Sequence, residues 1–218
     1  MMTNLFSSFD PSTTFIIQLN WISLILIFLF IPNKMWLLES RNSMTKLIIL
    51  NFIEKEMNFI YFNKQIINTL KSIFLLILII NLMGLIPFTF TPTSHLSISM
   101  AMGLPLWIAF MTFSWMNFSN TMFTHLLPMN TPPLIAPLMV LIESLSNIIR
   151  PISLSVRLTA NMIAGHLLMT LLGNINKINL MPMILILQMI LLSFEISVAF
   201  IQAYVFTILL TMYSSEIP

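Results

Sequence analysis

Apolar runs long enough to cross a membrane alternate with short polar stretches along this chain. Residues 14–31 are almost wholly apolar, and no Asp, Glu, Lys or Arg occurs from 72 to 142. A helix rises about 1.5 Å per residue and the hydrocarbon core of a bilayer is about 30 Å thick, so runs of roughly 20 residues can span it. The pattern therefore predicts transmembrane spans at 14–31, 72–88 and 96–118.

The stretch 33–71 differs in character, because six basic residues stand there against three acidic ones, a net charge of +3. Apolar positions recur at roughly helical spacing from Leu47 to Ile60, which predicts an amphipathic helix in the membrane interface; the alternative is a partly ordered linker. Positively charged loops stay on the cytoplasmic or matrix side. With five spans, the N-terminus then faces outward and the C-terminus inward.

The last third of the chain holds two apolar segments that are too long for upright spans. As helices, 134–172 and 178–214 would each measure about 55 Å, nearly twice the apolar thickness of a bilayer. They must tilt steeply or break into halves, and we expect two long, tilted helices in an antiparallel hairpin. The polar stretch 117–133 should be a loop, because its prolines stop any helix there. We therefore predict an all-α membrane protein: one membrane domain, 1–218, with about five transmembrane spans and an interfacial helix.

Composition supports this class and excludes others. Of the 218 residues, 58% are hydrophobic and 7% are charged, too few to cover a water-soluble protein. The net charge of +2 gives no basis for nucleic-acid binding, and the absence of cysteine excludes thiolate chemistry. Asp10 is the lone aspartate, so no Ser/His/Asp hydrolase is expected, and no phosphate-binding loop occurs. We expect no cofactor, no metal and no cleaved address sequence.

Several ionisable residues lie inside the two long apolar segments, namely Glu143, Arg150, Arg157, His166 and Glu195. Each costs about 2.5–3.5 kcal/mol or more in lipid, so each should face protein or water. At about 100° per residue, one stripe carries Glu143, Asn147, Arg150, Arg157 and Asn161, and His166 lies almost opposite Arg157. A second stripe, on the segment 178–214, repeats every seven residues and carries Gln188, Glu195 and Gln202. It should face the helix formed by 134–172.

Arg157 should lie near the midplane, between an outer pair, His166 and Glu195, and the inner Glu143. A guanidinium does not deprotonate in proteins, so Arg157 cannot relay a proton, but it can stabilise an ionised carboxylate. No acid on its own stripe lies within two turns. Its counter-charge then belongs to Glu195 or to another chain, and the structural alternative is an internal pair with Glu195.

Other candidates are weaker. Arg150 can reach the inner interface with its long side chain and is assigned no chemistry. His95 and His125 fall in or near predicted loops and are expected to have no functional role. At this point two further interpretations stay open. One is a proton- or cation-coupled secondary transporter, although no inverted repeat is found. The other is a purely structural subunit, which would leave the buried ionisable groups unexplained.

Two segments carry a family resemblance. PISLSVRLTANMIAGHLL at 151–168 and EISVAFIQAYVF at 195–206 resemble subunit a of the F-type ATP synthases in its mitochondrial form. MTNLFSSFDPST at 2–13 and LIESLSNIIRP at 141–151 are similar to arthropod versions. The likeness covers nearly the whole chain and is weakest from 33 to 71.

The resemblance implies a proton-channel stator subunit that performs no ATP chemistry itself. It implies that the two long helices lie against a rotating c-ring and that Arg157 faces the ring's proton-carrying carboxylate. It further implies an outer half-channel that brings protons in and an inner half-channel by which protons leave. The outer half-channel is lined by the positions of His166, Glu195, Asn161 and Gln202, and the inner one by the position of Glu143. Bacterial relatives often carry Glu and His in the reverse order at the positions of His166 and Glu195.

The resemblance also implies partners and a location. The partners are the c-ring, other stator and peripheral-stalk subunits, membrane lipid and protons as the transported ion, without nucleic acid. The location is the mitochondrial inner membrane, crossed several times, with the N-terminus toward the intermembrane space and the C-terminus toward the matrix.

Overall fold

The computed structural model describes residues 6, 9–12, 18–25, 38–61, 63–86, 89–127, 132, 134–174 and 181–215. Within these ranges the regular structure is entirely helical. In chain order the elements are η2 (Leu19–Ile22), α2 (Arg41–Ile60), α3 (Lys64–Gly84), η3 (Pro92–Ser94), α4 (Leu96–Asn117), α5 (Ser119–His125), α6 (Ala136–Gly173) and α7 (Met181–Ser215). The prediction of an all-α membrane protein is confirmed. Most of the first predicted span, 14–31, lies outside the described residues.

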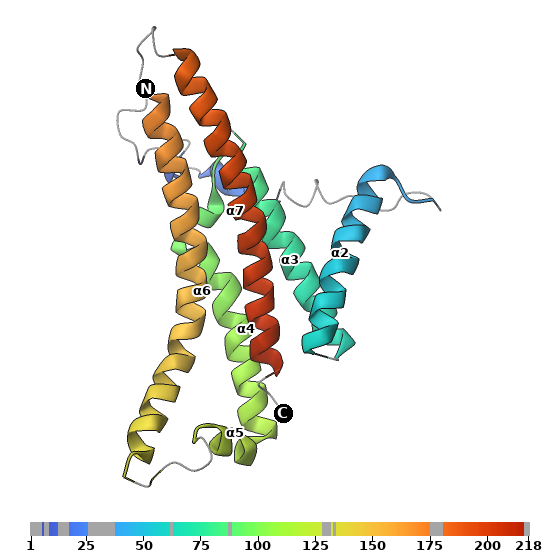
Figure 1. The fold of residues 1–218 in the computed structure, drawn as a ribbon, viewed down its shortest axis with the longest axis vertical. Helices are drawn as coiled ribbons and strands as arrows, with labels where there is room; N and C mark the ends of the chain where they lie inside the picture. Colours follow the sequence, from blue (N-terminus) through green and yellow to red (C-terminus); the bar gives the residue numbers. More distant parts are fainter. Residues whose placement is uncertain are drawn as a thin grey trace.

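Four of the described helices, α3, α4, α6 and α7, are long and apolar enough to cross a membrane. α6 has 38 residues and α7 has 35, which correspond to about 57 and 52 Å, well beyond the roughly 30 Å of a bilayer core. They run antiparallel and side by side (Figure 1). The predicted pairing of two long helices is therefore present, and α6 continues through Pro151 without a break in its helical assignment.

α2 and α3 form a hairpin on the side of the bundle away from α6 (Figure 1). α3 starts at Lys64, earlier than the predicted 72. The Asn63 side chain caps this start by accepting a hydrogen bond from the Gln65 backbone N–H at 3.2 Å. Lys71 stays inside the helix because its ammonium pairs with Glu54 of α2 at 2.9 Å. A lysine with a carboxylate beside it does not have to mark the end of an apolar helix.

The buried core joins this hairpin to α7. Met57 of α2, Leu70 and Ile77 of α3, and Phe206 and Leu210 of α7 are at most 2% exposed and belong to one cluster. The burial of these apolar side chains holds the hairpin against the C-terminal half of α7.

α2 is a regular helix, so the alternative of a partly ordered linker is wrong. Its start is capped by Ser40, whose hydroxyl accepts from the Ser43 backbone N–H. Ile53 and Met57 are buried, whereas Ile48 and Phe52 stay exposed. The helix therefore covers α3 with one face and leaves apolar side chains uncovered on another.

For the stretch between α4 and α6 the sequence prediction was wrong. A loop without helix was expected from 117 to 133, yet α5 occupies Ser119–His125. The prolines of this stretch all lie beyond the end of α5, and a proline disturbs the turn before it rather than a helix several residues away. The prolines therefore did not prevent a two-turn helix.

α4 crosses α6 through small residues. Ser99 and Gly103 of α4 and Ser155 and Thr159 of α6 are buried, and the Ser155 hydroxyl lies 3.0 Å from the Met100 sulfur. Interfaces between membrane helices favour such residues, because they let backbones approach closely. A Cβ added at Gly103 would stand 3.7 Å from Leu154 Cδ2, an ordinary contact with no room for a longer side chain.

We predict that Gly103→Leu destabilises this crossing whereas Gly103→Ala is tolerated. Overpacking of this kind costs about 1–3 kcal/mol. Thermal unfolding of the detergent-solubilised protein measures the difference, and the alanine variant serves as the control for loss of glycine. Equal midpoints for the two variants would contradict the close approach of α4 and α6.

Candidate functional site

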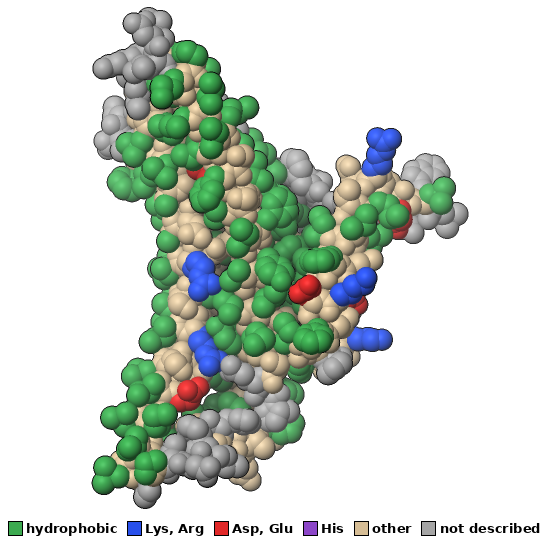
Figure 2. Space-filling model, in the orientation of Figure 1, with side chains coloured by type: hydrophobic (Ala, Val, Ile, Leu, Met, Phe, Trp, Pro, Cys, Tyr) green, Lys and Arg blue, Asp and Glu red, His purple; other side chains and the backbone are tan. Residues whose placement is uncertain are grey.

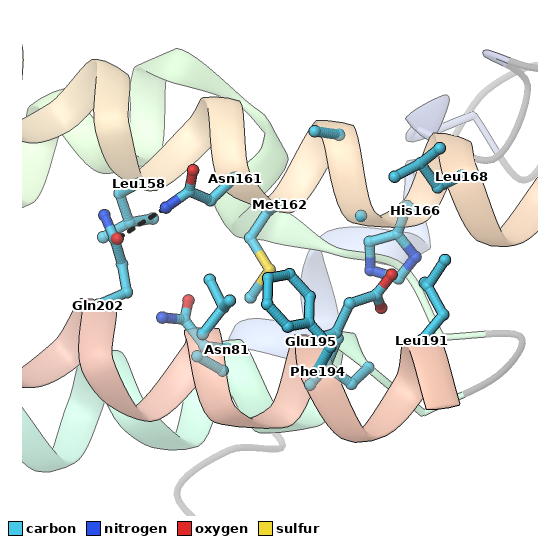
Figure 3. Close-up of a pocket in the computed structure, with 15 residues that line it drawn as sticks. Asn81, Leu158, Asn161, Met162, His166, Leu168, Leu191, Phe194, Glu195 and Gln202 are labelled. Carbon is cyan, nitrogen blue, oxygen red and sulfur yellow. Dashed lines mark hydrogen bonds between the residues drawn. The ribbon is translucent and has the colours of Figure 1, made fainter. Parts of the chain in front are cut away.

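A cavity of about 330 Å³ lies where α3, α6 and α7 meet (Figure 3). Most of its wall is apolar. Its polar lining residues come from all three helices: Asn81 of α3, Asn161 and His166 of α6, and Glu195 and Gln202 of α7. Such a volume accommodates several water molecules, and these polar groups can bind them.

The seven-residue stripe of α7 faces α6 along its whole length, as predicted. Gln202 accepts a hydrogen bond from the Asn161 side-chain amide at 2.8 Å. Glu195 stands opposite Gly165, and the side-chain nitrogen of Gln188 would lie 3.7 Å from a Cβ at Gly173. A stripe with period seven keeps one face of a long helix toward its neighbour with little drift.

His166 and Glu195 point toward each other across the cavity (Figure 3). Nε2 of His166 and Oε1 of Glu195 are buried, and neither has a hydrogen-bond partner among the described residues. Unpartnered buried polar atoms are costly, so these two atoms suit groups that bind water or exchange a proton.

Asn81 is a site residue that the sequence analysis missed. Its side chain is 0% exposed, and within the described structure both Nδ2 and Oδ1 lack a hydrogen-bond partner. It lies between the pair Asn161 and Gln202 and the pair His166 and Glu195 (Figure 3). A signal for it does exist, since Asn81 is the lone amide side chain in the apolar run 72–86. The amide extends the polar lining across the middle of the cavity.

Gly165 was also missed as a site residue. A Cβ at this position would stand 3.0 Å from both Cδ and Oε1 of Glu195, tighter than nine in ten real Cβ contacts. The absence of a side chain at 165 therefore gives the Glu195 carboxylate its place against the α6 backbone. The close approach of α6 and α7 depends on this glycine.

Arg157 lies one turn before Asn161 on α6, on the exposed face of the helix. Within the described residues, no acid stands within 4.0 Å of its guanidinium, so the internal pair with Glu195 is not formed. On the same face of α6, within one turn of it, lie the exposed and small or polar Ser153, Ala160 and Asn161. Figure 2 shows basic side chains along α6, with an acidic side chain beside the lower one. In lipid, such a cation requires an anionic partner from elsewhere.

Glu143 lies apart from this cavity, at the other end of α6. Its Oε1 is 3.8 Å from Nη2 of Arg150, whose guanidinium carbon stands 5.2 Å from the centre of the Tyr213 ring. Arg150 and Tyr213 line a second, smaller cavity of about 50 Å³, together with Asn147. Between the two cavities, α6 and α7 present buried apolar side chains: Leu154, Leu158, Ala203 and Phe206.

His95 follows η3 and is partly buried rather than solvated. Its Nε2 lies 3.0 Å from the backbone oxygen of Phe9, and its ring packs against Trp21 and Phe90. The side chain of His125 lies outside the described part of the structure. Among the residues described, no group of three or more His, Asp and Glu side chains could hold a metal ion.

Comparison with known proteins gives a consistent result. A family model described as ATP synthase A chain matches residues 13–215. The chain is 50% identical to ATP synthase subunit a of Locusta migratoria, 48% to that of Anopheles quadrimaculatus and 49% to that of Drosophila melanogaster. Each alignment covers 100% of this chain and 100% of the relative.

We predict that Gly165→Ala displaces the Glu195 carboxylate and destabilises the contact of α6 with α7. The steric cost is about 1–3 kcal/mol, partly offset by the higher helix propensity of alanine. Thermal unfolding measures the stability, and a high-resolution map measures the carboxylate position.

Gly173→Ala is the matched control, because its new Cβ meets Gln188 only at 3.7 Å. It should leave stability unchanged or raise it by up to about 1 kcal/mol. Combining Gly165→Ala with Glu195→Asp shortens the acid and should restore stability. If Gly165→Ala behaves like Gly173→Ala, the close approach at Glu195 is wrong.

Proposed function

The chain belongs to the ATP synthase A chain family, and from this premise we propose that it is the proton-translocating stator subunit of an F-type ATP synthase. In this function ATP is made on other subunits, and this chain passes protons to and from a rotating partner. The observation that carries the proposal is Arg157, an exposed cation on a helix that is apolar enough to cross a membrane, with no acid beside it in the described structure.

The partner of Arg157 is a carboxylate of the c-ring. The exposed side chains of α6 and α7 are overwhelmingly apolar, among them Ile149 and Ile152 on α6 and Met189, Ile190 and Phe194 on α7. Such a surface packs against lipid or against another apolar helix. An acid that arrives on that helix would neutralise Arg157 at the contact.

The outer half-channel is the cavity between α3, α6 and α7. His166 and Glu195 receive protons from the outer side, because both carry a buried unpartnered atom that faces the cavity. Asn161 and Gln202 continue the polar path to within one turn of Arg157. Asn81 binds water midway along it.

The inner half-channel starts at the second cavity, and Glu143, the partner of the cavity-lining Arg150, is the acid that accepts the leaving proton. Arg150 holds Glu143 at 3.8 Å and is itself stacked over Tyr213. Leu154, Leu158 and Phe206 separate this cavity from the outer one. A proton can therefore pass from one half-channel to the other only on the ring.

Coupling follows from the cost of charge in lipid. Beside Arg157 the ring carboxylate is held ionised, but facing lipid it must be neutral, because a bare carboxylate there is too costly. The ring therefore moves only when a proton is exchanged. A membrane potential sets the direction, since each charge moved through 100 mV releases about 2.3 kcal/mol.

The same proposal gives the chain its surroundings. It is placed in the mitochondrial inner membrane with the basic stretch 33–71 toward the matrix, which puts the N-terminus in the intermembrane space and the C-terminus in the matrix. Its protein partners are the c-ring and the other stator and peripheral-stalk subunits.

We predict that Arg157→Gln lowers the rate of proton-driven ATP synthesis at least about 100-fold while the complex still assembles. Loss of a preorganised charge has an effect of this size in other electrostatic sites. ATP synthesis by the purified complex in sealed vesicles measures the effect. Arg41→Gln removes the same charge from the exposed start of α2 and should leave synthesis unchanged. Retained coupling in Arg157→Gln would reject the role of the fixed cation.

We also predict that His166→Gln and Glu195→Gln each slow synthesis by about tenfold or more without uncoupling it, because a proton-transferring group contributes about 100-fold or more. The ratio of protons moved to ATP made should stay constant. Ser197→Ala is the control on α7, because its hydroxyl bonds the Phe194 carbonyl of its own helix. Wild-type rates in both variants would remove these residues from the outer half-channel.

A further inference from the structure

A cluster of side chains that the proposed mechanism does not use lies beside the outer cavity. His95 directly follows η3, and its Nε2 lies 3.0 Å from the backbone oxygen of Phe9. The rings of Trp21, Phe90 and His95 are all 5.4 Å apart, centre to centre. The Asn20 side-chain amide donates to the backbone oxygen of Asp10 at 3.4 Å. Two stretches of the N-terminal region are thus fastened to each other and to the loop before α4.

Phe9 connects this cluster to the outer half-channel. Its ring lies edge-on to the imidazole of His166, with centroids 6.2 Å apart and planes at 88°. Edge-to-face pairs of this geometry are attractive and have a preferred orientation. Phe9 therefore touches His166 with its side chain while His95 holds its backbone.

The orientation of the His166 ring needs such a contact. Nε2 of His166 is buried, and no hydrogen bond holds it among the described residues. A ring nitrogen without such a bond does not fix the orientation of the ring. A rigid aromatic edge against one face restricts rotation of the ring and keeps one nitrogen aimed at the cavity.

We propose that Phe9, anchored by His95, is a positioning residue that holds the His166 imidazole in the orientation in which it exchanges protons with Glu195. This inference rests on the proposed function of the outer half-channel. Because the cluster of Trp21, Phe90 and His95 fixes Phe9 in advance, the contact costs little ordering when a proton arrives. The N-terminal segment is thereby a working part of the proton path.

The test compares variants of Phe9 in the intact complex in sealed vesicles. Phe9→Leu keeps an apolar side chain but removes the aromatic edge, and should lower proton-driven ATP synthesis about threefold to tenfold, the range that corresponds to a lost aromatic pair. Phe9→Tyr keeps the ring and should restore the rate. Phe6→Leu is the matched control, because Phe6 lies in the same segment and is 64% exposed. A Phe9→Leu rate equal to that of Phe6→Leu overturns the inference.

A second arm asks whether Phe9 acts through His166. In the His166→Gln background, Phe9→Leu should cause no further fall, whereas two independent effects would multiply. The ¹⁵N signals of the His166 ring in the labelled complex should change with Phe9→Leu and not with Phe6→Leu. The same fold loss in both backgrounds, or unchanged ring signals, overturns the inference. If His166→Gln alone has no effect on synthesis, the proposed outer half-channel fails instead.

The anchor is tested separately. His95→Gln keeps a side-chain N–H that can reach the Phe9 carbonyl, and His95→Leu does not. The glutamine variant should retain most of the rate, and the leucine variant should show the same loss as Phe9→Leu. If both behave alike, His95 does not hold Phe9.

Discussion

The cost of an uncompensated charge in hydrocarbon governs the layout of α6 and α7. Arg157 cannot lose its proton, and in the described structure its own chain supplies no acid within reach. A membrane helix keeps such a residue when another molecule provides the opposite charge. On the proposed function, the exposed position of Arg157 and the apolar surface of α6 and α7 answer one requirement, a partner that is itself apolar and brings a carboxylate to Arg157.

The remaining polar groups are placed so that Arg157 stands at the end of a path rather than in the middle of one. On one side, the stripe of α7 meets α6 at Gln188, Glu195 and Gln202, and Gly165 allows the carboxylate to lie against the neighbouring backbone. Toward the other end of α6, Glu143 pairs with Arg150, which lines a separate small cavity. Close packing of Leu154, Leu158 and Phe206 keeps the two regions apart.

What the sequence predicts well here is what depends on one helix at a time. The lengths of α6 and α7 and the direction of the α7 stripe follow from apolar run length and helical periodicity. The start of α3 and the presence of α5 were missed, because Lys71 is neutralised by a residue of another helix and the prolines act only locally. Residues that act through contacts between distant parts of the chain are harder to find in the sequence. Asn81 shows as an isolated amide, but Gly165 acts through proximity to Glu195, and His95 meets Phe9 across 86 positions of the chain.

The apolar layer between the two cavities also bears on how the subunit is made. In a copy that no other subunit has yet reached, Leu154, Leu158, Ala203 and Phe206 would pack between the two cavities in the same way. On the proposed function, this layer and the guanidinium beside it oppose the direct passage of protons through the isolated subunit. Biogenesis could then proceed in an energised membrane without short-circuiting it.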